Sequence, residues 1–307
     1  MVKSVLITGA NAGLGREVAR QLADHDEIGR IYLACRNAAK AEAARVALQA
    51  QTGREIYDTI SLDTADLASA RSMVSSLPEP VDVLLMNAGG VGGHSPLATT
   101  PAGVTTVFAD NVLGHAALLE GLLAERKLTS AALYVGSEAA RGVPKLMIKR
   151  PTFPDSSIDE FAAVIDGSYF HGRKPDVMFA YGQVKYLAAL WIAAMARRHR
   201  QLRWATVSPG NTTGTQATDE MPLRERVLMR HVIPRVGPLL GLSHPLQTGA
   251  QHITDAIIHD RCSGGKFYAA KANTVVGPLV DQAEIRPELR EPTTQDNAYE
   301  AIHRFLT

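Results

Sequence analysis

A tyrosine and a lysine four positions apart have the clearest capacity for proton transfer in this chain. Tyr181 and Lys185 lie in the stretch Ala180-Tyr181-Gly182-Gln183-Val184-Lys185. The run that follows, 186–198, is rich in Ala, Leu and Met and contains no Gly or Pro, which predicts a helix. Residues four apart on a helix lie one above the other, and a nearby cation favours the ionised form of a phenol, whose ordinary pKa is about 10. We therefore expect this pair to exchange a proton near neutral pH.

Composition limits the kinds of protein that this chain can be. Its 307 residues are 46% hydrophobic and 21% charged, an ordinary globular balance, and the net charge of +1 does not favour nucleic acid as a partner. Two cysteines, Cys35 and Cys262, are too few for a disulfide framework and fit a reducing compartment. No apolar run approaches about 18 residues, and no signal-peptide layout is seen. We expect a soluble cytoplasmic protein without a membrane span, and the ten histidines show no metal-ligand spacing.

A glycine-rich turn near the N-terminus follows a short β-branched strand over 4–8 and precedes a helical pattern over 16–22. The turn reads Gly9-Ala10-Asn11-Ala12-Gly13-Leu14-Gly15. Free N–H groups and the helix dipole favour an anion at a helix N-terminus, and glycines let the backbone approach a pyrophosphate. The alternative is an ordinary tight turn with flexible glycines. The strand and helix on either side favour a dinucleotide-binding turn.

The end of the second predicted strand, 30–34, bears on the choice of cofactor. An NAD-binding unit usually places an acidic residue there, on the ribose 2′-hydroxyl. This chain has Cys35, Arg36 and Asn37 instead. An arginine suits a 2′-phosphate, so the sequence favours NADP over NAD, with a solvated surface arginine as the alternative.

Further strands alternate with helical patterns and predict a parallel sheet. The expected strands are 56–62, 81–86, 131–135, 204–207 and a short one over 265–268. Right-handed crossovers then give a Rossmann-type, doubly wound α/β fold of about seven strands, in a single NAD(P)-binding domain over residues 1–307. A ligand crosses the carboxyl ends of such strands, where Asp63, Asn87 and Ser137 lie. A long helix over 105–123 carries Asn111 in a largely apolar stretch.

Taken together, these signals resemble the short-chain dehydrogenase/reductase family, from Val5 to about Gly210. The matching positions are Thr8-Gly9, Gly13, Gly15, Asp63, Asn87-Ala88-Gly89, Asn111, Ser137, Tyr181, Lys185 and Pro209-Gly210. The resemblance implies that Tyr181 donates or accepts the proton, and that Lys185 lowers its pKa and binds the nicotinamide ribose. It also implies that Ser137 holds the substrate oxygen and that Asn111 supports a water relay to bulk solvent. The implied cofactor contacts are Gly9, Asn11, Ala12, Gly13, Leu14, Gly15, Arg36, Asn37, Asp63, Thr64, Asn87, Ala88, Gly89, Tyr181, Lys185, Pro209, Gly210 and Thr212.

Two positions depart from the family pattern. The family often has two asparagines before Ala-Gly, and the first position here is Met86. A threonine for the nicotinamide carboxamide is expected a few residues after Pro209-Gly210, where the chain has Gly214 flanked by Thr212, Thr213 and Thr215. The threonine that makes this contact therefore stays open.

An insert separates Ser137 from Tyr181 by 44 positions, whereas many family members have only a dozen or so. Its segment 143–178 carries Pro144, Pro151 and Pro154, and the capping-box pattern Ser157-Ile158-Asp159-Glu160 predicts a short helix to Ile165 that Gly167 ends. A long insert with its own helix is a candidate lid or substrate wall. Inserts here resemble the protochlorophyllide-reductase and retinol-dehydrogenase branches of the family.

A second segment, 211–245, is expected on the substrate side as well. Within it, 221–242 mixes apolar residues with four arginines and is broken by Pro222, Pro234 and Pro238. It could cover a bulky apolar substrate, pack within the domain, or make weak peripheral contact with a membrane surface.

The expected function is NADP-dependent hydride transfer between nicotinamide and a carbonyl/alcohol substrate of small-molecule size. The alternatives are reduction of a conjugated C=C bond, as in protochlorophyllide reductase, and a non-catalytic regulator that senses NADP. The bulk of the insert beside the Tyr181 helix, like that of monomeric carbonyl reductases, predicts a monomer or at most a dimer.

Overall fold

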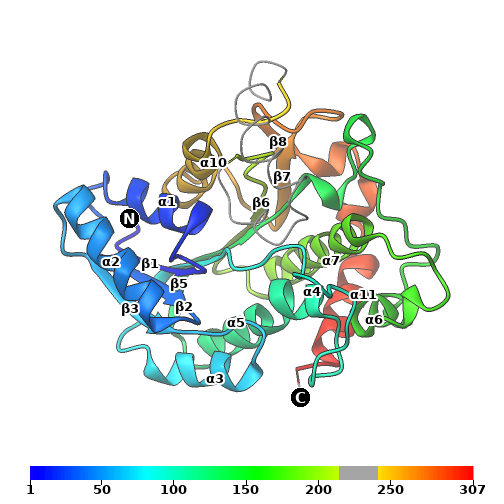
Figure 1. Cartoon of the computed structure of the whole chain (residues 1–307), viewed down its shortest axis with the longest axis horizontal. Helices are drawn as coiled ribbons and strands as arrows, with labels where there is room; N and C mark the ends of the chain where they lie inside the picture. The colour runs from blue at the N-terminus through cyan, green and yellow to red at the C-terminus, as the bar shows by residue number, and fades with distance from the viewer. Residues whose placement is uncertain (214–240, 307) are drawn as a thin grey trace.

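The computed structural model describes residues 1–213 and 241–306, and its centre is one eight-stranded sheet (Figure 1). The strand order is β3-β2-β1-β4-β5-β6-β7-β8. Seven strands run parallel and β8 pairs antiparallel with β7 at one edge. The bounds are β1 Ser4–Thr8, β2 Arg30–Cys35, β3 Tyr57–Ser61, β4 Val81–Met86, β5 Leu128–Val135, β6 Arg203–Val207, β7 Lys266–Ala270 and β8 Leu279–Asp281.

The strand order reverses between β1 and β4, and this reversal locates the ligand crevice. The chain runs outward from β1 to β3 and then returns to β4 on the other side of β1. In open parallel sheets a ligand binds outside the carboxyl ends of the strands at such a switch point. The residues that leave these ends are Gly9 after β1, Asn87 after β4 and Ser137 shortly after β5. The predicted site residues therefore share one edge of the sheet.

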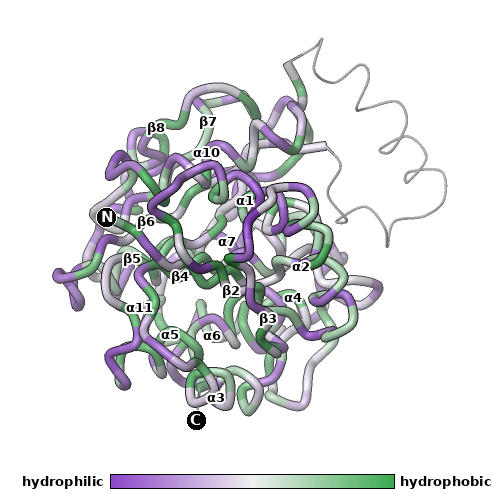
Figure 2. The backbone as a smooth tube through the Cα atoms, turned by 90° about the vertical axis from the view of Figure 1, so that its left-hand side faces the viewer, coloured by the Kyte–Doolittle hydropathy of each residue, from purple (hydrophilic) through white to green (hydrophobic). Residues whose placement is uncertain are grey.

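Helices cover both faces of the sheet and define two cores (Figure 1). One face packs against α1 (Gly13–Leu22), α2 (Ala38–Thr52) and α10 (Leu246–Ile258), with Val5 and Ile7 pointing into it. Leu6 points to the other face, which packs against α3 (Leu67–Ser76), α5 (Gly114–Ala124), α7 (Val177–Arg198) and α11 (Pro292–His303). This alternation is the period of two expected of a strand buried on both faces. Hydrophobic stretches lie in the interior and many turns at the periphery are hydrophilic (Figure 2).

The predicted α/β fold with seven parallel strands is confirmed, and two local predictions need correction. β8 was missed because it has three residues, all half-buried, which carry no clear alternation. The single helix expected over 105–123 is instead α4 (Thr106–Phe108), a π-helical turn (Ala109–Leu113) and α5. The Gly114 N–H donates to the Thr64 carbonyl, 3.0 Å away, and so leaves the regular helical ladder at the point where the helix widens.

The insert is a packed element, as predicted. Its helix α6 (Ile158–Asp166) begins at Ser157, whose hydroxyl accepts from the Glu160 N–H at 3.1 Å, and ends at Gly167 with φ +89°. The Glu160 carboxylate accepts from the Ser156 N–H at 2.9 Å instead of closing the expected box on Ser157. Phe161 is fully buried against the remainder of the domain.

Among residues 1–213 and 241–306, two stretches of helix are apolar and long enough to cross a membrane by composition alone. They are Thr106–Ala124 and Val177–Arg198. In the folded domain, 72% and 78% of their most apolar windows are buried. Their hydrophobicity is therefore that of core helices packed against the sheet.

Candidate functional site

The structure brings Ser137 and Tyr181 together at the end of β5. Ser137 begins the turn Glu138–Ala140, and its Oγ accepts from the Ala139 N–H at 3.2 Å. Tyr181 lies in the first turns of α7, near enough to Ser137 for that side chain to lower the pKa of the phenol. Between them Gly182 permits close approach, because a Cβ there would lie 2.6 Å from the Ala139 carbonyl oxygen. The insert thus leads into a helix whose first turn packs directly on the Ser137 turn.

Burial keeps the Tyr181 phenol protonated. Removal from water raises the pKa of Tyr181 to about 12, the hydrogen bond from Ser137 opposes this rise, and the carboxyl of Glu138 adds to it. Lys185 lies with its Nζ 5.7 Å from the centre of the Tyr181 ring and directs its hydrogen bonds elsewhere. The lowering of the Tyr181 pKa by Lys185 that the family resemblance implies stays a prediction. At neutral pH Tyr181 carries its proton.

Lys185 is buried and held by two acceptors on β5. Its Nζ donates to the Tyr134 hydroxyl at 3.1 Å and to the Val135 carbonyl at 3.0 Å. Burial lowers the pKa of Lys185 to about 7, because the ammonium has lost most of its hydration. An ammonium has three N–H donors, and two of them have acceptors among the described residues. The third is left for a ligand hydroxyl.

Replacing Lys185 with methionine should raise stability most at low pH. Below about pH 7 the folded protein bears the full penalty of a buried charge, since both the folded and unfolded states are protonated. Between the folded pKa of about 7 and the ordinary value of 10.5, only the unfolded state keeps the proton, so the wild-type protein gains stability as pH rises. The advantage of Lys185→Met should therefore shrink over this range. Urea unfolding at about pH 6 and about pH 9 measures the difference in unfolding free energy between Lys185→Met and wild type. A difference that is the same at both pH values would contradict the lowered pKa of Lys185.

The glycine turn and the loop after β4 meet at Thr8. The Thr8 hydroxyl accepts from the backbone N–H groups of Asn87 and Ala88, both at 2.9 Å, and the Asn87 side-chain amide donates to the Thr8 carbonyl at 2.8 Å. Gly9 has φ +66°, and a Cβ on Gly15 would lie 2.5 Å from the Asn87 amide nitrogen. The predicted dinucleotide residues Gly9 to Gly15 and Asn87 to Gly89 therefore form one continuous surface at the N-terminus of α1.

The Asn111 side chain anchors the loop after β4 by a hydrogen bond. Its amide donates to the carbonyls of Gly90 and Val107, both at 2.7 Å. A Cβ on Gly89 would collide with the Asn111 side-chain oxygen, so a glycine is required there. The Asn111 main-chain carbonyl already accepts hydrogen bonds from Tyr134 and His115. The water relay through Asn111 stays a prediction.

Arg36, Asn37, Asp63 and Thr64 lie at the same sheet edge, on the β2–β3 side. Arg36 is exposed, and the Asn37 side chain caps α2 by accepting from the Lys40 N–H at 2.9 Å. The Asp63 side chain accepts from the Ala65 N–H at 3.0 Å. Their place beside the glycine turn suits contacts with the adenosine half of a dinucleotide. A cavity of 220 Å³ between α1, α2 and α10 is lined in part by Gly13 of the glycine turn and does not include Tyr181.

The loop after β6 carries the third part of the predicted site. Gly210 has φ +79°, which favours glycine, and a Cβ there would lie 2.5 Å from the His244 Nε2. The Thr212 hydroxyl donates back to the carbonyls of Pro209 and Gly210, at 3.3 and 3.1 Å. Gly214, Thr215 and nearly all of the segment 221–242 lie outside the described residues. In residues 1–213 and 241–306, no group of three or more His, Cys, Asp or Glu is placed to hold a metal ion.

Sequence reasoning missed Tyr134 and His115, which line the site from the core. Tyr134 precedes the last residue of β5, and His115 lies in the first turn of α5. Both side chains are fully buried. A tyrosine and a histidine within apolar runs were the only available signals, and their partners come from distant parts of the chain.

Comparisons with known proteins agree with this geometry. A family model described as "short chain dehydrogenase" matches residues 3–143. Retinol dehydrogenase 12 of Bos taurus is 31% identical over 198 residues, which cover 63% of this chain and 60% of that protein. Retinol dehydrogenase 13 of Homo sapiens is 33% identical over 201 residues, covering 64% and 54% respectively. The chain spans about half the length of the curated relatives it matches.

Solved structures share the fold at low sequence identity. Salutaridine reductase from Papaver somniferum has a TM-score of 0.63 and 18% identity, covering 87% of this chain and 100% of its own. An NADP active-site complex of RhlG from Pseudomonas aeruginosa has a TM-score of 0.61 and 18% identity, covering 86% and 93%. The chain thus shares the fold of these solved structures.

Proposed function

The chain belongs to the short-chain dehydrogenase/reductase family, and on that premise we propose that it is an NADP-dependent oxidoreductase acting on a carbonyl/alcohol pair. The observation that carries this proposal is that Ser137, the protonated Tyr181 and the buried Lys185 lie together at the carboxyl end of β5, two strands from β1 and on the same edge of the sheet as its switch point. The group that supplies or takes the hydride is the nicotinamide, when bound. The protein orients the substrate, donates a proton and makes a hydrogen bond to the substrate oxygen.

Each side chain has a defined part in carbonyl reduction. The Ser137 hydroxyl donates a hydrogen bond to the substrate oxygen and orients the carbonyl. Tyr181, with a pKa of about 12, keeps its proton until negative charge develops on that oxygen and then donates it. The free N–H of Lys185 binds a ribose hydroxyl and fixes the cofactor relative to the phenol. In alcohol oxidation the same groups act in reverse.

Arg36 is proposed to select NADP. Its exposed guanidinium follows β2 at the ligand edge, where a planar fork suits a 2′-phosphate. Arg36→Ala should weaken NADPH binding by about 10- to 150-fold, a loss of about 1.5–3 kcal/mol, and should weaken NADH binding much less. Arg45→Ala is the matched control, because Arg45 lies farther along α2 and pairs with Glu42. Fluorescence titration measures both affinities, and equal losses for NADPH and NADH would remove Arg36 from the 2′-phosphate.

A bulky, apolar small molecule is the proposed substrate. Support comes from exposed hydrophobic residues in and next to the insert that leads to Tyr181: Met147, 91% exposed, and Val177 and Met178, each 36% exposed. The retinol dehydrogenases among the relatives point in the same direction. Purified protein and NADPH should be offered ketones, aldehydes, quinones and enones, with the products identified. Saturated ketones from enones would favour the alternative, reduction of a conjugated C=C bond.

A regulator that senses NADP without turnover is the competing function. Sensors on this fold are expected to lose the tyrosine or the lysine, whereas this chain keeps both, together with Ser137 and Asn111. Tight NADPH binding without turnover of any compound in the panel would support the sensor.

A cytoplasmic monomer, or at most a dimer through another surface, is the proposed form. The packed insert lies beside α7. In a symmetric dimer through α7, each subunit would bring its own insert into the interface, and both inserts would obstruct the contact. Light scattering should give a mass near 33.0 kDa. A stable tetramer would contradict this arrangement.

A further inference from the structure

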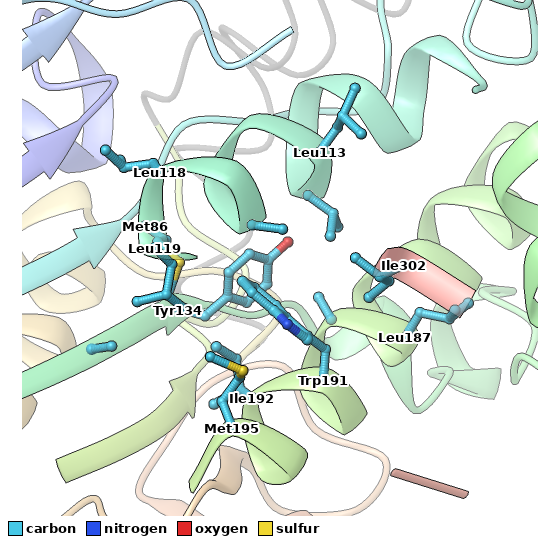
Figure 3. Packing of buried hydrophobic residues seen from close by; sticks show 14 of the residues in the cluster. Met86, Leu113, Leu118, Leu119, Tyr134, Leu187, Trp191, Ile192, Met195 and Ile302 are labelled. Atoms are coloured by element: carbon cyan, nitrogen blue, oxygen red, sulfur yellow. The ribbon is translucent and has the colours of Figure 1, made fainter. Parts of the chain in front are cut away.

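Tyr134 places a phenol hydroxyl in the middle of a hydrophobic core. Its side chain is fully buried, and its ring lies among Leu119, Trp191 and Met86 (Figure 3). A buried phenol hydroxyl needs hydrogen-bond partners to offset the loss of water. Tyr134 has two, and both belong to the candidate site.

The hydrogen bonds of Tyr134 have a fixed direction. Its hydroxyl lies 3.2 Å from the Asn111 carbonyl, which can only accept, so the phenol proton points to Asn111. A lone pair of the same oxygen then accepts from the Lys185 Nζ at 3.1 Å. The ammonium also lies 4.6 Å from the centre of the Tyr134 ring, a distance that allows cation–π attraction. Tyr134 thus contacts Lys185 through both its hydroxyl and its ring.

The chain of hydrogen bonds continues through His115 to the cofactor loop. His115 Nδ1 lies 2.8 Å from the Asn111 carbonyl, and Nε2 lies 2.8 Å from the Thr8 hydroxyl. Because a carbonyl cannot donate, Nδ1 must carry the proton, and Nε2 of the neutral ring accepts from Thr8. Burial lowers the pKa of His115 to about 4, which keeps this ring neutral. The Thr8 oxygen in turn accepts from the N–H groups of Asn87 and Ala88.

We propose that Tyr134 is a positioning residue for Lys185, and that the chain Lys185–Tyr134–Asn111–His115–Thr8 joins the amine rigidly to the Asn87–Ala88 loop. A lysine side chain has a flexible four-carbon stem, and two acceptors on β5 fix its end. The third N–H is then aimed at the ligand. This inference rests on the proposed function for the use made of that third N–H, but the positioning itself is a property of the unliganded protein.

The groups around Lys185 determine how its ionisation should respond. Tyr134 on β5 and Tyr181 on α7 are phenols whose pKa values burial raises, and His115 on α5 is neutral. In the turn after β5, burial also raises the pKa of Glu138, which accepts from the Ser208 hydroxyl at 2.7 Å. An acceptor on an ammonium favours the charged form. Loss of the Tyr134 oxygen should therefore lower the pKa of Lys185.

Tyr134→Phe tests the inference because it removes only the hydroxyl. The pKa of Lys185 should be measured by NMR on lysine-labelled protein without cofactor, with the signal assigned by Lys185→Met. We expect it to fall by about one unit or more, since a hydrogen bond to a charged group is lost. The affinity for NADPH should begin to decline at correspondingly lower pH. Tyr57→Phe on β3 is the matched control, because it removes another buried phenol hydroxyl, which donates to the Thr52 hydroxyl at 3.3 Å.

The outcomes separate the inference from the proposed function. An unchanged pKa of Lys185 in Tyr134→Phe, or an equal change in Tyr57→Phe, overturns the positioning role even if NADPH is turned over. A lowered pKa without NADPH binding supports the positioning role and rejects the proposed cofactor. If Tyr134→Phe does not fold, 4-aminophenylalanine at position 134 keeps the ring and an N–H donor for Asn111 but is a poor acceptor, because its nitrogen lone pair is delocalised into the ring. The pKa of Lys185 should then fall by a smaller amount, and no change would overturn the role.

Discussion

Replacing Tyr181 with phenylalanine should lower the turnover number by at least about 100-fold and leave NADPH affinity nearly unchanged. The substitution removes the proposed proton donor but keeps the ring that packs at the start of α7. With a pKa of about 12, the wild-type phenol is protonated over the whole neutral range, so the loss should not depend on pH there. The measurement is the steady-state rate of NADPH oxidation beside a titration of NADPH binding.

A distant tyrosine provides the control for this substitution. Tyr299 is half-buried on α11 and stacks on His303, with ring centres 3.7 Å apart. Tyr299→Phe should leave the rate within about twofold of wild type, because surface changes away from a site have small effects. Near-wild-type turnover in Tyr181→Phe would show that another group donates the proton.

Replacing Gly114 with alanine should destabilise the fold by about 1–3 kcal/mol or more. A Cβ at this position would lie 2.6 Å from the Cα and 2.7 Å from the carbonyl carbon of Thr64, which are backbone atoms and cannot rotate away. Either α5 or the turn after β3 must move, and the 3.0 Å hydrogen bond from Gly114 to Thr64 would be strained or lost. Urea unfolding measures the loss.

Gly29→Ala is the matched glycine control. The nearest atom to a Cβ there is the Lys3 carbonyl oxygen at 3.9 Å, and the backbone is not in the left-handed region. This variant should be as stable as wild type or slightly more stable, because alanine restricts the unfolded chain. If Gly114→Ala were equally harmless, the close approach of α5 to Thr64 would be incorrect.

Local sequence patterns were enough to place the strands that carry the site. Ser4–Thr8 and Val81–Met86 were predicted with their observed bounds, because strands buried on both faces are short apolar runs with clear ends. The glycine turn and the insert helix were also predictable, since φ values near +66° and +89° need glycine at Gly9 and Gly167.

Features that depend on contacts distant in sequence could not be predicted. The π-helical turn near Asn111 follows from a hydrogen bond between Gly114 and Thr64, 50 positions away. Likewise, helical spacing relates Lys185 to Tyr181, four positions away, and gives no sign of its two acceptors, Tyr134 and Val135 on β5. Helical spacing indicates which residues share one face of a helix. It does not indicate which residue from a distant part of the chain packs against that face.

Lys185 illustrates how stability and the proposed function conflict at one position. Its burial lowers the pKa to about 7, which means that the charged form is unfavourable inside the fold. The same burial fixes the amine between two acceptors and leaves one N–H for the cofactor ribose. Methionine at this position is expected to stabilise the protein at low pH and to abolish that contact.

In the proposed reaction, hydride passes from NADPH to a carbonyl carbon while Tyr181 supplies the proton. The most direct measurement uses NADPH deuterated on the transferred position and a bulky enone as substrate, with the product analysed by NMR. We predict deuterium on the carbinol carbon of an allylic alcohol, formed at a rate at least about 100-fold lower in Tyr181→Phe. Deuterium on the β-carbon of a saturated ketone, or consumption of NADPH that does not depend on Tyr181, would contradict the account.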